Sequence, residues 1–300
     1  MRFSVEDVAS FEGVYSALLT PFDHEGEINE EVLRRLANFQ LEKGLHGFFV
    51  CGSTGEGILM TPQERKRVAE VAVDETAGRG KVIVHVGHAS SRISAELAEH
   101  AEQIGADAVG SVPPFYYDVG VEGTLYHYQL VAQACSLPFM AYNLPSVGVV
   151  GLTPNLVPRL REIETFVGMK YTGYNLYEMQ GIVELLGENG IVLSGSDQLF
   201  LPALTMGARG SIGSTQNILP DRFVGLYEAY RAGDFAKAQA LQAEINRFMR
   251  VIHKYGNPCR KAYAKRLGFD CGDYRPPFKP MTEGQVQSFL AEMDAVEGGE

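Results

Sequence analysis

The sequence predicts an α/β protein, a (β/α)₈ TIM barrel with additional C-terminal helices. Short apolar runs alternate with longer amphipathic stretches, and eight such runs occur between Val14 and Gly213. Each run is continuously apolar, which is typical of parallel strands buried on both faces. A doubly wound open sheet is the alternative, but it would normally have fewer strands and often a dinucleotide-binding fingerprint, which the sequence lacks.

The predicted strands are short and rich in Val, Ile, Phe or Ala. They cover Val14–Leu19, Gly47–Val50, Val82–Val86, Ala108–Val112, Pro138–Tyr142, Phe166–Lys170, Ile191–Ser194 and Gly210–Gly213. Helical patterns separate them: Thr61 is predicted to cap a helix over Pro62–Glu75, and Thr153 with Pro154 opens another. This repeated order of strand and helix favours a barrel over an open sheet.

After Gly233 only helical patterns remain. One apolar stripe comprises Leu241, Ile245, Phe248, Met249 and Ile252, and a second comprises Val286, Phe289, Leu290 and Met293. We therefore expect a catalytic barrel over residues 1–232 and a C-terminal helical extension, residues 233–300, packed on the barrel. The Gly- and Pro-rich link over Asp270–Pro280 is predicted to be a surface connection.

Composition narrows the possible partners. The 300 residues carry a net charge of −11 without a long Lys/Arg run, which argues against nucleic acid and anionic membranes. The first twelve residues do not resemble a signal peptide, and no apolar stretch has the length of a membrane span. Four cysteines without a C-x-x-C pair predict free thiols in a reducing cytoplasm. An anionic small substrate stays compatible, because a pocket can be locally positive.

Barrel enzymes place their sites where the strands end, so polar residues there are the candidates. The loop Gly52–Gly57 combines three glycines with two hydroxyls and suits a carboxylate or a phosphate, although a plain tight turn is the alternative. The loop Pro113–Tyr117 carries adjacent tyrosines that either reach a site or form a packing patch. Tyr142 is either a proton-transfer residue or a buried tyrosine with a satisfied hydroxyl.

A lysine that closes an apolar strand is the most informative single residue. Burying the charge of Lys170 is costly, so the side chain is either part of an ion pair or a nucleophile that attacks carbonyls. Gly195, Asp197, Gln198 and Ser214 follow the last two strands and suit a hydroxylated substrate tail, with helix capping as the alternative for Asp197 and Ser214.

Several of these segments form ordered motifs. They are Ala17-Leu18-Leu19-Thr20-Pro21-Phe22, Gly52-Ser53-Thr54-Gly55-Glu56, Tyr142-Asn143-x-Pro145, Lys170-x-Thr172 and Gly213-Ser214-Thr215. Together they resemble the N-acetylneuraminate lyase / dihydrodipicolinate synthase family, and more closely its N-acetylneuraminate lyase branch. The resemblance implies a class I aldolase on a (β/α)₈ barrel, which acts on a small 2-keto acid and releases pyruvate. It also implies a homotetramer, with no metal and no cofactor beyond the covalent Schiff base.

The resemblance further implies residue roles. Lys170 would form the Schiff base, Ser53 and Thr54 would hold the substrate carboxylate, and Tyr142 would transfer the proton with Ser53 and Tyr116 as a relay. Tyr116 matches the tyrosine that reaches across a subunit interface. The remaining implied substrate contacts are Ala17, Thr172, Gly195, Asp197, Gln198 and Ser214.

Two positions depart from the family patterns. Val147 stands where dihydrodipicolinate synthases typically carry an arginine, and Gln198 stands where the sialic acid lyases usually carry a glutamate. Another 2-keto-3-deoxy sugar acid is therefore an alternative substrate, and dihydrodipicolinate synthase an alternative activity. A metal-dependent class II aldolase would rest on His85 and His88, which are predicted to point to opposite faces of a strand. A non-catalytic barrel that senses a sugar acid is a further alternative.

Overall fold

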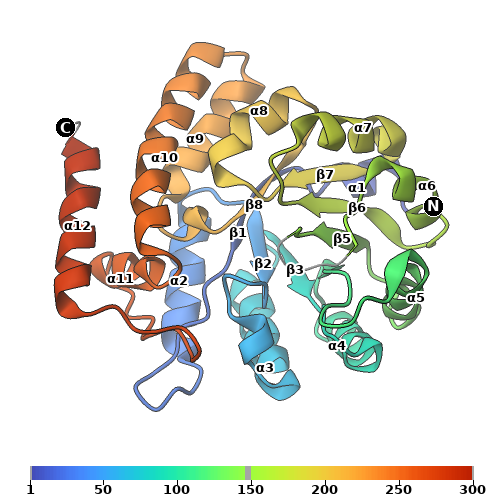
Figure 1. Ribbon diagram of the computed structural model, residues 1–300, viewed down its shortest axis with the longest axis horizontal. Helices are drawn as coiled ribbons and strands as arrows, with labels where there is room; N and C mark the ends of the chain where they lie inside the picture. The colour runs from blue at the N-terminus through green and yellow to red at the C-terminus, as the bar shows by residue number, and fades with distance from the viewer. Residues whose placement is uncertain (1, 146–149, 299–300) are drawn as a thin grey trace.

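The computed structural model describes residues 2–145 and 150–298, and over these residues eight parallel strands close into a barrel (Figure 1). The strands follow one another around the barrel in chain order, and β8 pairs with β1. They are β1 (Gly13–Ala17), β2 (Gly47–Val50), β3 (Lys81–His85), β4 (Ala108–Ser111), β5 (Phe139–Asn143), β6 (Phe166–Tyr171), β7 (Ile191–Ser194) and β8 (Gly210–Gly213). The predicted (β/α)₈ barrel is confirmed, with every strand boundary within two residues of its predicted place.

The continuous apolar character of the strands follows from burial on both faces. On β2, Phe48 packs under the surrounding helices, whereas Phe49 points into the barrel. On β3, Val84 faces the helices and Ile83 faces the interior. Because successive side chains of a strand point to opposite faces, both positions of each pair must be apolar.

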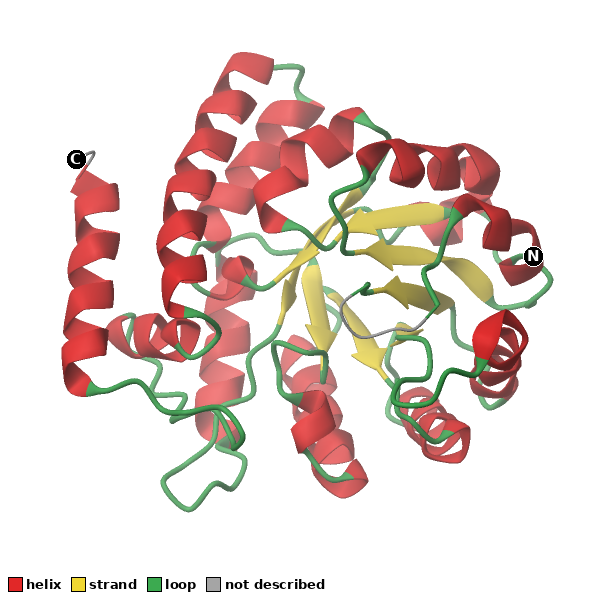
Figure 2. Cartoon of the chain, in the orientation of Figure 1, coloured by secondary structure: helices red, strands yellow, loops and turns green. Residues whose placement is uncertain are grey.

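Helices surround the strands (Figure 2). In the described residues the barrel helices are α2 (Glu30–Glu42), α3 (Pro62–Thr76), α4 (Ser91–Gln103), α5 (Gly120–Gln133), α6 (Val157–Leu160), α7 (Leu176–Leu186), α8 (Phe200–Thr205) and α9 (Pro220–Arg231). Short 3₁₀ turns are η1 (Gly57–Leu59), η2 (Pro154–Leu156), η3 (Gly187–Asn189), η4 (Asp197–Leu199) and η5 (Thr215–Asn217). Among residues 2–145 and 150–298, no helix combines the length and hydrophobicity needed to cross a bilayer.

The start of α3 shows how local sequence sets a helix boundary. The Thr61 hydroxyl accepts a hydrogen bond from the Glu64 amide at 3.2 Å, and the Glu64 carboxylate accepts one from the Thr61 amide at 2.7 Å. Pro62 occupies the first helical position, where a missing N–H costs nothing. The predicted cap and start of this helix are confirmed.

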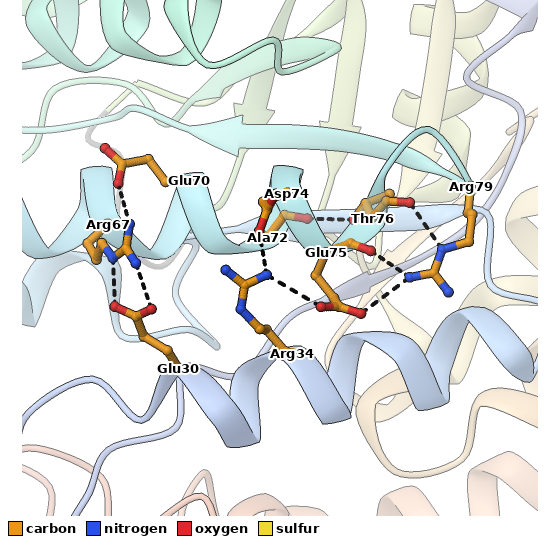
Figure 3. Close-up of polar contacts among 9 residues, drawn as sticks. All are labelled: Glu30, Arg34, Arg67, Glu70, Ala72, Asp74, Glu75, Thr76 and Arg79. Carbon is orange, nitrogen blue, oxygen red and sulfur yellow. Dashed lines mark hydrogen bonds and ion pairs between the residues drawn. The ribbon is translucent and has the colours of Figure 1, made fainter.

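Surface ion pairs join α2 to α3 (Figure 3). Both oxygens of Glu30 accept from the Arg67 guanidinium, at 2.6 and 2.7 Å, and Arg34 reaches Asp74 at 2.6 Å. These side chains are largely exposed, so each pair contributes only about 0–1 kcal/mol. The inner faces of the two helices are buried, with Leu33 and Leu36 on α2 and Val68 and Ala72 on α3.

The N-terminal helix α1 (Val5–Ala9) closes one end of the barrel. Val8 and Phe11 are buried and belong to the same interior cluster as Tyr15 of β1. Since they precede β1, they fill the end of the barrel at which the strands begin. The opposite end, where the strands finish, is therefore the end at which a site can form.

The C-terminal helices α10 (Phe235–Tyr255), α11 (Cys259–Arg266) and α12 (Glu283–Gly298) lie together on one side of the barrel, with α12 outermost (Figure 1). Phe289 of α12 packs on Tyr255 and Tyr263. The prediction that Asp270–Pro280 is a surface connection is wrong in part, because Cys271 and Tyr274 within it are buried. Both belong to the main hydrophobic cluster, and the centre of the Tyr274 ring lies 4.8 Å from the Lys261 Nζ of α11.

Candidate active site

Lys170 lies at the carboxyl end of β6, and its side chain enters the barrel. The residue is only 5% exposed, and its direct register partner on β5 is Tyr142. The Lys170 Nζ lies 4.2 Å from the centre of the Tyr142 ring and 4.5 Å from that of Phe49. The amine is therefore held between two aromatic rings.

The ion-pair alternative for Lys170 finds no support in the described residues. Across residues 2–145 and 150–298, no carboxylate lies within 4.0 Å of its Nζ, although many other cations of the chain have such partners. An amine that is buried among rings and engaged by no described carboxylate is available for covalent chemistry.

Tyr142 is buried beside the amine. Its ring packs edge-on against Phe49, with centroids 5.6 Å apart, and against His85 at 5.9 Å. Among the residues that the structure describes, none forms a hydrogen bond with the Tyr142 hydroxyl. The Tyr142 hydroxyl is therefore unengaged by the described protein groups.

The loop after β2 is folded tightly, and two of its residues carry donors that no described residue engages. The Gly57 amide donates to the Gly52 carbonyl at 3.0 Å, and a Cβ at Gly57 would lie 1.8 Å from the Cys51 carbonyl oxygen. Ser53 is exposed and Thr54 half-buried, and no described residue accepts a hydrogen bond from their amides or hydroxyls. Such a set of free N–H and O–H donors suits a carboxylate.

A second free donor lies beside Lys170. The Thr172 Oγ1 is buried and has no hydrogen-bond partner in the described part of the chain. A Cβ at Gly195 would lie 1.9 Å from this oxygen and 3.2 Å from the Lys170 Cε. The β7 loop therefore approaches the amine closely only because residue 195 is a glycine.

Asp197 holds the β8 loop in place. It is buried, and its Oδ2 accepts from the Thr215 amide at 2.9 Å and from the Ser214 hydroxyl at 3.4 Å. Asp197 is thus engaged with the β8 loop, whereas neither it nor Ser214 makes a side-chain cap hydrogen bond at the start of its own 3₁₀ turn. Gln198 is less buried, and its Nε2 donates to the Tyr174 hydroxyl at 2.9 Å.

The other predicted site residues differ in their surroundings. Ala17 ends β1 and belongs to the interior cluster that includes Phe49 and Tyr142. Tyr116, by contrast, is 84% exposed and packs edge-on against Tyr117, so it lies outside the buried cluster of its own chain. Phe49 is a site residue that no motif singled out; its inward position on β2 is the signal that identifies it.

His85 and His88, on which a metal site would rest, form hydrogen bonds to backbone groups instead. The His85 Nδ1 donates to the Cys51 carbonyl at 3.1 Å, and its Nε2 accepts from the Val112 amide at 3.4 Å, while burial lowers the pKa of the ring well below its ordinary value. The His88 Nδ1 accepts from the Ser90 amide. Within residues 2–145 and 150–298, no three His, Cys, Asp or Glu side chains cluster as metal ligands.

Comparison with known proteins identifies the family. A model of the dihydrodipicolinate synthetase family matches residues 10–296. The chain belongs to the dihydrodipicolinate synthetase family. As a member, it is a carbon–carbon lyase of the class I aldolase type.

The relatives that resemble this chain include proteins of two different activities. N-acetylneuraminate lyase of Salmonella typhimurium is 38% identical over 248 residues, which are 82% of this chain and 83% of the relative. The structure of Proteus mirabilis N-acetylneuraminate lyase has a TM-score of 0.90 and 29% identity, covering 95% of this chain and 98% of the other. Dihydrodipicolinate synthase from Aquifex aeolicus has a TM-score of 0.90 and 32% identity, covering 96% and 98%. Structural likeness alone therefore does not choose between the two activities.

One position that bears on this choice, Val147, lies outside the described residues.

Proposed function

We propose that this protein is an N-acetylneuraminate lyase-like aldolase that cleaves or forms a C–C bond in a 2-keto acid through a Schiff base on Lys170, with pyruvate as the released fragment. The observation that carries the proposal is the position of the Lys170 amine, which is buried between Tyr142 and Phe49 with no described carboxylate partner. The family membership supports the same chemistry.

In the proposed reaction, each of these residues acts at a different step. The Lys170 amine adds to the keto carbon, and loss of water leaves an iminium. Tyr142, with Ser53 and Tyr116 as a relay, takes the proton of the C4 hydroxyl as the C3–C4 bond breaks. The electron pair of that bond moves into the iminium to give an enamine, and the aldehyde leaves. Protonation at C3 and hydrolysis then return pyruvate and free lysine.

Binding of the keto acid needs a partner for its carboxylate. The amides and hydroxyls of Ser53 and Thr54 supply donors, and the unpartnered hydroxyl of Thr172 supplies another near the amine. Ala17, Gly195, Asp197, Gln198 and Ser214 would then surround the rest of the substrate. Asp197 would act mainly by ordering Ser214, because its Oδ2 already accepts two protein donors.

The substrate tail is the less determined part. Identity to N-acetylneuraminate lyases supports a sialic acid, whereas the neutral Gln198 favours another 2-keto-3-deoxy sugar acid. Val147 in place of the arginine argues against dihydrodipicolinate synthase. The exposed Tyr116 is the residue that a homotetramer would bring to the site of a neighbouring subunit, and four free, buried thiols support a cytoplasmic location.

Borohydride trapping tests the proposal. The protein is incubated with pyruvate, reduced and digested, and the modified peptide is mapped by mass spectrometry. We expect a reduced pyruvyl adduct on Lys170 that is absent from Lys170→Ala. A folded protein that gives no adduct would refute the Schiff-base chemistry. Turnover of N-acetylneuraminate, of other 2-keto-3-deoxy sugar acids, and of pyruvate with aspartate semialdehyde then identifies the partner.

A further inference from the structure

Glu56 closes the Gly52–Gly57 loop with a buried carboxylate. It is 2% exposed and adopts a left-handed backbone conformation with φ of 58°, which is unusual for a residue with a side chain. Its amide donates to the Ser53 carbonyl at 3.2 Å, so the Glu56 backbone is tied directly to the residue that presents donors at the mouth. A buried carboxylate in this position requires a partner.

The partner comes from the C-terminal helices. The Lys261 Nζ on α11 lies 2.8 Å from the Glu56 Oε1, and the two side chains are 2% and 0% exposed. The same ammonium donates to the Asp273 carbonyl at 3.0 Å and lies over the rings of Phe22 and Tyr274. Among the described residues, Lys261 is the cation that pairs with Glu56.

The second oxygen of Glu56 is held by the segment that precedes α12. The Arg275 amide donates to Glu56 Oε2 at 2.7 Å, while the Arg275 guanidinium bonds Gly26 O at 2.6 Å and Glu64 Oε1 at 2.5 Å. Residues outside the barrel therefore hydrogen-bond one carboxylate oxygen and ion-pair with the other. Burial raises the pKa of Glu56 and lowers that of Lys261, and the charge of each partner opposes the shift of the other.

We propose that Lys261 and Arg275 position the Ser53–Thr54 donors for the substrate carboxylate by clamping Glu56, so that α11 and the segment before α12 set the affinity for the keto acid. The inference rests on the proposed function, because that function assigns the carboxylate to Ser53 and Thr54. Lys261 is a positioning residue: it acts through Glu56 and touches no reacting atom. Its loss leaves a buried carboxylate with no cation, which the loop relieves by moving.

The test measures the pyruvate concentration that gives half-maximal borohydride trapping on Lys170. Lys261→Met should raise this concentration about tenfold, while trapping at saturating pyruvate stays near the wild-type level. Adding Glu56→Gln to Lys261→Met should recover part of the affinity, because it removes the unpaired charge. Phe289→Leu is the control: it weakens the same part of the chain without touching the loop.

The outcomes separate the two proposals. No trapping in the wild-type protein defeats the proposed function itself. Where the wild type is trapped, two results would overturn the positioning role alone. One is an unchanged half-saturating pyruvate concentration in folded Lys261→Met. The other is an equal rise of that concentration in Phe289→Leu of matched melting temperature. If Lys261→Met does not fold, Glu56→Asp decides instead, because its shorter side chain cannot reach Lys261 with the loop in place. Unaltered affinity in Glu56→Asp also overturns the inference.

Discussion

Tyr142 and Lys170 are register partners on adjacent parallel strands, and the Lys170 Nζ lies 4.2 Å from the centre of the Tyr142 ring. Residues in register on neighbouring strands point to the same face, so both side chains enter the barrel interior. A substrate carbon bound to this amine would therefore lie within reach of the phenol.

The first prediction concerns Tyr142→Phe. The ring remains beside the amine, so trapping of pyruvate on Lys170 should persist. Cleavage needs the phenol as an acid–base group, and kcat should fall about 10²- to 10⁴-fold. Steady-state turnover and borohydride trapping on the same preparation check both parts. A variant that loses trapping as well would show that the hydroxyl serves Schiff-base formation instead.

The second prediction concerns the close approach of Gly195 to Lys170. A methyl group there would meet the Thr172 Oγ1 and the Lys170 Cε, so Gly195→Ala should displace the amine and lower kcat/KM by about 100-fold. Gly284→Ala is the matched control, because a Cβ at that position meets nothing within 4 Å. Kinetics of the two variants suffice, and equal activity would contradict the steric argument.

The third prediction is a loss of stability in acid that originates at His127. Burial lowers the pKa of the His127 ring to about 4, so the ring is neutral near pH 7. Ser111 donates its hydroxyl proton to the Val112 carbonyl and so accepts from His127 Nε2, and the Nδ1 of the neutral ring then accepts from the Ser91 hydroxyl.

The unfolded chain, with a histidine pKa near 6.5, binds the proton more readily than the native state between pH 6.5 and 4. The contribution of neutral His127 to the free energy of unfolding is therefore fully present above about pH 6.5. It falls by about 1.4 kcal/mol per pH unit as the pH decreases through that window. Urea unfolding of wild type and His127→Gln at several pH values should show a shallower slope in the variant. Exposed His253→Gln is the control and should leave the slope unchanged.

The fourth prediction concerns the substrate tail. Gln198→Glu introduces a charged acceptor next to the Tyr174 hydroxyl, and charge-assisted hydrogen bonds are stronger than neutral ones. For a polyhydroxylated sugar acid we expect kcat/KM to rise about 5- to 10-fold. Tyr174→Phe tests whether the present partner of Gln198 matters. A fall in kcat/KM on all sugar acids would indicate that the neutral amide is the selected group.

The fifth prediction concerns the exposed ion pairs between α2 and α3 (Figure 3). Arg67→Ala removes the contacts to Glu30 and Glu70, and the free energy of unfolding should fall by less than about 1 kcal/mol. The difference from wild type should shrink further in high salt, because exposed charges are screened. If the free energy of unfolding fell by several kcal/mol, the ion pairs would be shown to contribute as much as buried ones do.

The barrel was predictable because its signal is local. Each strand is buried on both faces, and this leaves a continuous apolar run that a single sequence reveals, as at Gly47–Val50 and Ile191–Ser194. The strand-end rule then placed Lys170 and Tyr142 at one end of the barrel. Their direct juxtaposition, however, depends on the register of β5 against β6, which short apolar runs do not specify.

The Glu56 contacts were not predictable because their signal is not local. Glu56 looks like an ordinary member of a glycine-rich loop, and its partner Lys261 lies in a helix far along the chain. The segment Asp270–Pro280 has the composition of an exposed link, yet Tyr274 is buried because it covers the ion pair. Amino-acid composition indicates where turns form, whereas the burial of this segment depends on its contacts with residues elsewhere in the chain.

The closure of the barrel floor by Val8 and Phe11 has a kinetic consequence. Since Val8 and Phe11 fill the end at which the strands begin, the proposed reaction would release both fragments of a cleaved substrate at the other end. Under the proposed function, the fragment bound to Lys170 is the inner of the two. The aldehyde would then depart first and the covalently held pyruvate last, so pyruvate should be a competitive product inhibitor and the aldehyde a noncompetitive one.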